Sequence, residues 1–212
     1  MRSQLSTVLL GLGIAATAQA QTPNLNQDGP FALRVKGQAR NSSINGYLHT
    51  VDLGPVLIQK PLQYEAISSP PAGNLTYQFY FNYTGFSQSE GNEIGFFLSD
   101  TDLETVSNSG LYGRPLSLQY SAGSNVAYAL TGNGAASSIG VNKENKTFIN
   151  ILFDDSTYVP GQVPPVGNFD FYNWAICWQF FARVYMPSLS WITYGPSHNP
   201  TCERVDLIRE VL

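Results

Sequence analysis

Hydrophobic and polar positions alternate along much of this chain with the period of a β-strand. The clearest run is 75–83 (LTYQFYFNY), where leucine and aromatic residues occupy every second position and most of the others are polar. Because successive side chains of a strand point to opposite faces, this run predicts one strand with a buried and a solvent-facing side. Asn74 and Asn82 fall on the polar side, so we expect both side chains to face solvent.

Shorter runs of the same kind follow, and clusters of Gly, Pro, Asn and Ser separate them. We predict further strands at 31–36, 47–52, 56–59, 93–98, 116–120, 126–131, 147–153, 174–185, 189–194 and 204–211. No segment shows a sustained helical period. The pattern therefore predicts an all-β fold: a single-domain antiparallel β-sandwich over residues 30–212, with a barrel-like variant as the alternative.

The segment 169–194 holds the densest group of aromatic residues, including all three tryptophans. In an extended conformation one of its faces carries a mostly aromatic set, and Cys177 points to the opposite face. That set is Tyr172, Trp174, Ile176, Trp178 and Phe180. We interpret the segment as a central hairpin that is linked at its far end to Cys202.

The aromatic residues have two interpretations. In the first, Trp174, Trp178 and Trp191 fill the core, because large aromatic side chains contribute most to burial. In the second, some of the aromatic residues form an exposed, flat platform that binds sugar rings. The candidates for this ligand-binding platform are Trp191, Tyr194, Tyr185 and Tyr112. The exposure of their side chains decides between the two interpretations.

The N-terminus has the features of a secretory signal peptide. Arg2 precedes an apolar run from Leu5 to Ala18, and a small-residue cleavage site ends at Ala20. We expect residues 1–20 to be removed and residues 21–29 to form a polar N-terminal arm. No later segment has the ~20 apolar residues that a bilayer span needs. The protein is therefore expected to be secreted, either extracellular or associated with the cell wall, with no membrane span.

The balance of charge narrows the choice of partner. The chain has 11 basic residues against 15 acidic ones, and loss of the leader removes one basic residue more. This balance argues against nucleic acid or an anionic membrane as the partner, because both require clustered Lys and Arg. Only 12% of the residues are charged, against about a quarter in an average soluble domain. We expect a polar but mostly uncharged surface.

Two kinds of covalent modification fit an oxidising, secretory compartment. Four sequons, Asn-x-Ser/Thr, are expected to carry N-linked glycans, at Asn41, Asn74, Asn82 and Asn145. Two cysteines, Cys177 and Cys202, are expected to form one disulfide.

The C-terminal sequence resembles that of a known group of proteins. Segments 172–177 (YNWAIC), 189–192 (LSWI) and 198–206 (HNPTCERVD) are similar to the signature of an uncharacterised family of small, secreted, β-rich fungal proteins. Segment 30–35 (PFALRV) also looks like the first strand of that family. The resemblance implies a secreted, mostly β protein with its two cysteines paired. It implies no catalytic residues.

Candidate acid–base residues are few, and none lies in a recognisable catalytic motif. Asp154, Asp155 and Asp170 flank predicted strands, and a pair of such carboxylates at the right separation suits glycoside hydrolysis. Aspartates at strand ends more often cap turns. His49 and His198 are the two histidines, and either could act as a general base. His198 lies in a Pro- and Asn-rich turn and is interpreted as part of that turn.

One acidic cluster, Asp100, Asp102 and Glu104, places three carboxylates at alternate positions. Carboxylate oxygens are ligands for calcium, but the glycine and the distant glutamate of an EF-hand loop are missing. We interpret this cluster as a solvated turn, and we expect no metal and no cofactor.

These observations favour a secreted glycoprotein with a non-catalytic binding or structural role at the cell wall or in the extracellular matrix, with a glycan as its ligand. The first alternative is a small, metal-independent enzyme of the secretory pathway that uses an Asp/His pair: an isomerase, cyclase or hydrolase, for example in secondary metabolism. Such an enzyme requires a deep apolar pocket in which titratable side chains converge. The second alternative is a secreted effector that binds a host protein through an exposed apolar patch.

Overall fold

The computed structural model describes residues 26–54, 59–99, 113–132 and 134–212. Several predictions from the sequence therefore lie outside the described residues: the signal peptide at 1–20, residues 21–25 of the N-terminal arm, nearly all of the strand at 56–59, the acidic cluster at 100–104 and Tyr112.

The described residues form antiparallel β-strands and two short 3-10 helices, η1 and η2. The N-terminal elements are β1 (Asn26–Gly37), β2 (Asn45–Thr50), β3 (Lys60–Glu65), η1 (Leu75–Tyr77), β4 (Phe79–Ser89), β5 (Asn92–Ser99) and β6 (Arg114–Gln119). The C-terminal elements are β7 (Val126–Thr131), β8 (Ile139–Val141), β9 (Thr147–Ile151), η2 (Asp155–Thr157), β10 (Phe169–Phe171), β11 (Trp174–Phe181), β12 (Val184–Ile192) and β13 (Glu203–Val211). The prediction of an all-β, antiparallel fold is confirmed.

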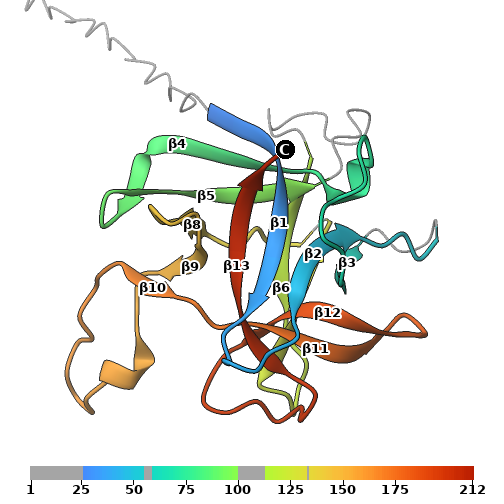
Figure 1. Ribbon diagram of the computed structural model, residues 1–212. Coiled ribbons are helices and arrows are strands. Elements are labelled where there is room, and N and C mark those ends of the chain that lie inside the picture. Colours follow the sequence, from blue (N-terminus) through green and yellow to red (C-terminus); the bar gives the residue numbers. More distant parts are fainter. Residues whose placement is uncertain (1–25, 55–58, 100–112, 133) are drawn as a thin grey trace, which may run out of the picture.

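Strand pairing closes on itself, as in the barrel-like variant. From β1 the pairings run through β13, β11, β12, β7, β6, β5 and β4 and return to β1. The strand β2 lies on one side of this circuit and pairs with both β1 and β3. On the other side, β8, β9 and β10 extend the sheet from β5. Figure 1 shows β1 and β13 side by side at the centre, with the β11–β12 hairpin projecting from the rest.

The main core lies between these strands and is built from alternating positions. In β1, Phe31, Leu33 and Val35 face this core, because they occupy every second position. Trp174 is its largest fully buried side chain; its indole Nε1 donates to the carbonyl oxygen of Thr147 at 3.1 Å. The interpretation of the tryptophans as core residues is confirmed for Trp174 and Trp191 and is wrong for Trp178, which is 46% exposed.

The clearest strand pattern of the sequence begins later than predicted. Segment 75–83 starts as the 3-10 helix η1, because the side chain of Asn74 accepts a hydrogen bond from the backbone N–H of Thr76 and caps the turn. Leu75, which the alternation placed in the core, is 64% exposed. The extended pairing begins only at Phe79.

Asn82 does not face solvent, so the outward orientation expected for it is wrong. Its side chain is 2% exposed, and its Oδ1 accepts a hydrogen bond from Gln27 Nε2 at 2.8 Å. The cause is that the segment 26–28, expected to be a loose arm, pairs with β4 as part of β1 and covers this position. Asn41, Asn74 and Asn145 are exposed, which is compatible with glycosylation; glycosylation at these positions stays a prediction.

The predicted strand 174–185 is in fact two strands and a turn. Ala182 and Arg183 both have positive φ, 45° and 77°, and connect β11 to β12 as a tight hairpin. Glycine and asparagine are the usual residues of such turns, so this one left no signal in the sequence. The predicted strand at 189–194 is the end of β12. Strands β3, β8 and β10 were not predicted.

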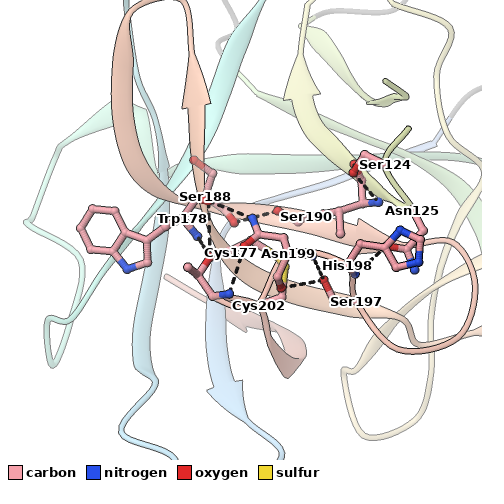
Figure 2. Close-up of a disulfide and its surroundings, with 12 residues drawn as sticks. Ser124, Asn125, Cys177, Trp178, Ser188, Ser190, Ser197, His198, Asn199 and Cys202 are labelled. Carbon is pink, nitrogen blue, oxygen red and sulfur yellow. Dashed lines mark hydrogen bonds between the residues drawn. A yellow bond between two sulfur atoms is a disulfide. The ribbon is translucent and has the colours of Figure 1, made fainter. Parts of the chain in front are cut away.

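The predicted disulfide between Cys177 and Cys202 is confirmed. It joins the middle of β11 to the residue just before β13, and its sulfur atoms lie in a small apolar cluster with Val126, Ala175 and Ile192. Figure 2 shows Cys202, at the end of the loop that connects β12 to β13, close to Cys177 of β11.

Candidate functional groove

The described residues enclose a groove of about 850 Å³ between β9, the η2 segment and the loop that follows β12. This volume lies within the ~300–1,000 Å³ that is typical of small-ligand sites. Its floor is apolar and is formed by the buried or half-buried side chains of Leu118, Ile149, Phe171 and Trp191; the more exposed Ile151 and Phe153 also line the groove. Trp191 packs edge-to-face on Trp174, with ring centroids 4.9 Å apart, so the floor is continuous with the core.

Three tyrosines stand on the rim of the groove. Tyr120, Tyr158 and Tyr194 are 62%, 51% and 82% exposed, although each lines the cavity. They come from three separate segments, after β6, after η2 and after β12. The groove therefore opens to solvent between these three aromatic side chains. Their presence is not explained by core packing, because they are exposed.

Asn125 makes several hydrogen bonds to the loop that carries Tyr194. Asn125 Nδ2 donates to the carbonyl oxygens of Tyr194 and Pro196, at 2.6 and 2.7 Å. Its Oδ1 accepts from the backbone N–H of His198 at 2.9 Å, as Figure 2 shows. The backbone N–H of Thr193 donates to the Asn125 carbonyl oxygen. These bonds fix the backbone of this part of the rim.

Polar groups of both charges line the groove. The guanidinium of Arg204 donates to Asn173 Oδ1 at 3.0 Å and to the Gly195 carbonyl oxygen at 3.3 Å, so neutral acceptors position it. Asp154 caps η2, because its Oδ1 accepts from the N–H and the hydroxyl of Ser156 at 3.0 and 2.7 Å. Asp155 also lines the cavity. These groups and Thr193 supply the hydrogen-bonding capacity around the apolar floor.

The five candidate acid–base residues do not converge. Asp154 and Asp155 reach the groove, whereas Asp170 accepts a hydrogen bond from Asn150 Nδ2 at 2.8 Å outside it. His198 is held through its backbone N–H, and its side chain does not line the groove. His49 lies on β2, where its Nε2 is 3.9 Å from Glu65 Oε2 and its ring stacks on Tyr77.

The cluster around His49 supports a prediction about stability at alkaline pH. Burial, together with the hydrogen bond from the Tyr77 hydroxyl to Glu65 and the charge of that carboxylate, raises the pKa of Tyr77 well above its usual value. Above about pH 10 the unfolded chain has lost a proton that the folded chain retains, so the free energy of unfolding falls as pH rises. Tyr77 contributes at most about 1.4 kcal/mol per pH unit to this fall.

Tyr77→Phe is expected to make the alkaline decline less steep, because it removes this proton. The measurement is urea unfolding of both proteins at pH 8, 10 and 11. Below pH 10 the variant should differ from the wild type by a constant amount, about 1 kcal/mol for one lost hydrogen bond. Equal slopes above pH 10 would contradict the assignment. Tyr47 and Tyr172 also contribute to the alkaline decline in the free energy of unfolding of the wild type, because burial raises the pKa of each.

The predicted aromatic platform is divided between two places. Tyr194 stands on the groove rim, but Trp191 is only 6% exposed and belongs to the floor. Tyr185 lies at the other end of β12. Four further lining residues were not predicted from the sequence, because nothing in their local sequence indicates that four distant segments meet: Tyr120, Tyr158, Asn173 and Arg204.

The described ranges contain no helix with the length and apolar character to cross a membrane. The same residues contain no group of three or more His, Cys, Asp or Glu side chains arranged to hold a metal ion. Comparison with protein-family models, curated proteins and solved structures finds no match to the chain. The resemblance to small fungal proteins therefore stays a prediction.

Proposed function

We propose that this protein is a secreted glycoprotein that binds a glycan in the groove without transforming it. The observation that carries the proposal is the groove itself, an apolar floor rimmed by exposed Tyr120, Tyr158 and Tyr194. Sugar rings have apolar faces and polar edges. They suit a site in which aromatic rings contact the faces while polar groups bond the hydroxyls.

The polar groups of the groove agree with this ligand class. Arg204 and Asn173 offer N–H donors, and Asp155 offers carboxylate acceptors, which together match the hydroxyl groups of a sugar. Arg204 is already oriented by its bonds to Asn173 and Gly195, so little side-chain entropy is lost when it binds. Cations and anions both line the groove, which favours an uncharged ligand.

The residues that line the groove fit a binding role better than a catalytic one. Asp154 and Asp155 are the titratable carboxyl groups in the described lining, and Asp154 is engaged as the cap of η2. No histidine belongs to that lining, whereas the enzyme hypothesis expects an Asp/His pair. A role at the cell wall or in the extracellular matrix follows from the expected secretion and from the glycan ligand.

Truncation of a rim tyrosine tests this function. Tyr194→Ala and Tyr158→Ala are each expected to weaken the binding of an oligosaccharide about tenfold, because each removes an aromatic contact worth about 1.4 kcal/mol. The ligand is first found by screening the wild-type protein on a glycan array, and its affinity is then measured by titration calorimetry. The high exposure of both side chains predicts unchanged thermal stability.

The matched control is Leu75→Ala, which removes a large exposed side chain far from the groove lining and should leave affinity unchanged. Lack of binding to every glycan on the array would contradict the proposed function, and so would equal affinities of the wild type and the two tyrosine variants. Conversion of a bound oligosaccharide into a product would instead support the enzyme hypothesis.

A further inference from the structure

The β11–β12 hairpin carries a second set of exposed rings, which the core does not explain. Every second pair of opposite residues in this hairpin faces the same side. The first two of these pairs are Trp174 with Trp191 and Ile176 with Leu189, and all four side chains are buried. The same side continues with Trp178 opposite Pro187 and Phe180 opposite Tyr185. We call these last four residues the aromatic hairpin face.

The aromatic hairpin face lies beyond the core. Trp178, Phe180 and Tyr185 are 46%, 64% and 57% exposed. Folding gives no reason for apolar rings at these positions, because exposed strand residues are free to be polar. The indole of Trp178 points away from the disulfide and its hydrogen-bonded neighbours in Figure 2.

The reverse side of the hairpin anchors it to the body of the protein. Gln179 and Met186, paired on that side, are 6% and 3% exposed. The ring of Phe181 packs on Tyr128 with centroids 5.7 Å apart, and the Tyr128 hydroxyl donates to the carbonyl oxygen of Phe180 at 3.2 Å. One side of the hairpin is therefore docked and the aromatic hairpin face is left open.

The backbone under the aromatic hairpin face is held in place before any ligand binds. The disulfide of Cys177 directly precedes Trp178. The Trp178 N–H donates to Thr201 Oγ1 at 2.9 Å, and its carbonyl oxygen accepts from Asn199 Nδ2 at 3.0 Å. The rings of Trp178 and Tyr185 contact each other, with centroids 5.2 Å apart and planes at 33°. Such preorganisation lowers the entropy cost of binding.

The charge and size of the aromatic hairpin face indicate its ligand. Between residues 174 and 192 the one charged residue is Arg183, at the turn. Three rings that are each about half exposed offer about 200–400 Å² in all. That area is well below the ~800 Å² per partner of a stable protein interface, so a second copy of the chain does not fit it. Flat sugar rings fit the aromatic hairpin face, because the stacking of a sugar ring on an aromatic ring needs little area and no charge.

We propose that the aromatic hairpin face binds the flat ring faces of an uncharged, solid polysaccharide, as a site separate from the groove. Tyr185 and Trp191, which is on the groove floor, are six positions apart in β12, or about 20 Å along the strand. When the groove also binds a glycan, one molecule holds two glycan segments at once, and the first contact strengthens the second. The proposal does not depend on the groove, because different residues carry it.

The test measures retention of the full chain on particles of microcrystalline cellulose and of chitin, as binding isotherms from depletion of the supernatant. Trp178→Ala combined with Tyr185→Ala is expected to lower the partition coefficient at least about tenfold on the particles that bind the wild type. Trp178→Phe, which keeps a ring, should retain most of the binding. Leu75→Ala is the control at an exposed position outside both sites.

The outcomes separate the two proposals. Loss of retention in the double variant supports the hairpin site, whether or not the groove binds. If the groove binds soluble oligosaccharide, the double variant should keep that affinity. Equal retention of wild type and double variant, or no retention of the wild type on either particle, would overturn it. A wild-type dimer in sedimentation that the double variant converts to monomer would overturn it too, in favour of a contact between copies. If the double variant does not fold, Phe180→Ala tests the same face.

Discussion

Trp174→Ala is expected to lower the free energy of unfolding by about 3–5 kcal/mol, the largest effect of any single substitution considered for this protein. The side chain is fully buried at the centre of the main core. Its removal leaves a cavity against Trp191 and deprives the Thr147 carbonyl oxygen of its indole donor. Both effects act in the same direction, because the cavity loses packing and the buried oxygen loses a hydrogen bond.

Chemical unfolding of the wild type and the variant measures this loss. The matched control is Trp178→Ala, which deletes the same side chain where it is 46% exposed and should cost less than half as much. Equal effects of the two substitutions would contradict the assignment of Trp174 to the core and Trp178 to the surface. Because Trp174 supports Trp191, its replacement should also weaken binding in the groove.

Removal of the disulfide is expected to have the second largest effect. The bridge closes a loop with a sequence separation of 25 residues, and the chain-entropy account assigns about 3 kcal/mol to a loop of this length. Alanine is the appropriate replacement at both positions, because Cys177 is fully buried and a serine hydroxyl there would add a desolvation cost of its own. The measurement is the difference in the free energy of unfolding between the oxidised wild type and Cys177→Ala combined with Cys202→Ala.

The same bridge organises both proposed binding surfaces. Cys202 ends the loop that carries Tyr194 to the groove, and Cys177 precedes Trp178 on the hairpin. Reduction of the wild type by dithiothreitol should therefore reproduce the stability loss of the double alanine variant and weaken both binding activities. A change below about 1 kcal/mol in the alanine variant would show that the hydrogen bonds of Asn199 and Thr201 hold this region without the sulfur link.

Secondary structure was predictable where burial alone governs a strand. The bounds predicted for the strand at 126–131 agree with those of β7, and the last strand differs by one residue at its start. In these strands the buried positions produce the expected alternation or continuous apolar run. The pattern misled where a local polar contact competed with it, as at Asn74, whose capping bond turns Leu75 out of the core.

The candidate site was much less predictable. Of the four residues proposed for the aromatic platform, Tyr194 lines the groove rim, Trp191 lies below it and Tyr185 belongs to the opposite end of the hairpin. Tyr120 and Tyr158 join Tyr194 only because strands far apart in the chain pair and bring their ends together. Alternation reports which side of a strand a residue occupies, but not where along its length the core ends, so it could not separate Trp174 from Trp178.

The amino-acid sequence by itself determined the β class of this protein, most of its strands and the pairing of its two cysteines. Periodicity and turn residues can be read within one segment, and the number of cysteines can be counted without knowing the fold. The tertiary structure alone decided the closed circuit of strands, the burial of Asn82, the turn at Ala182 and the groove itself. The turn is local and was missed because Ala182 and Arg183 are not typical turn residues. The other three features depend on contacts between segments that are distant in the chain, and such contacts leave no periodic trace in the sequence of either segment.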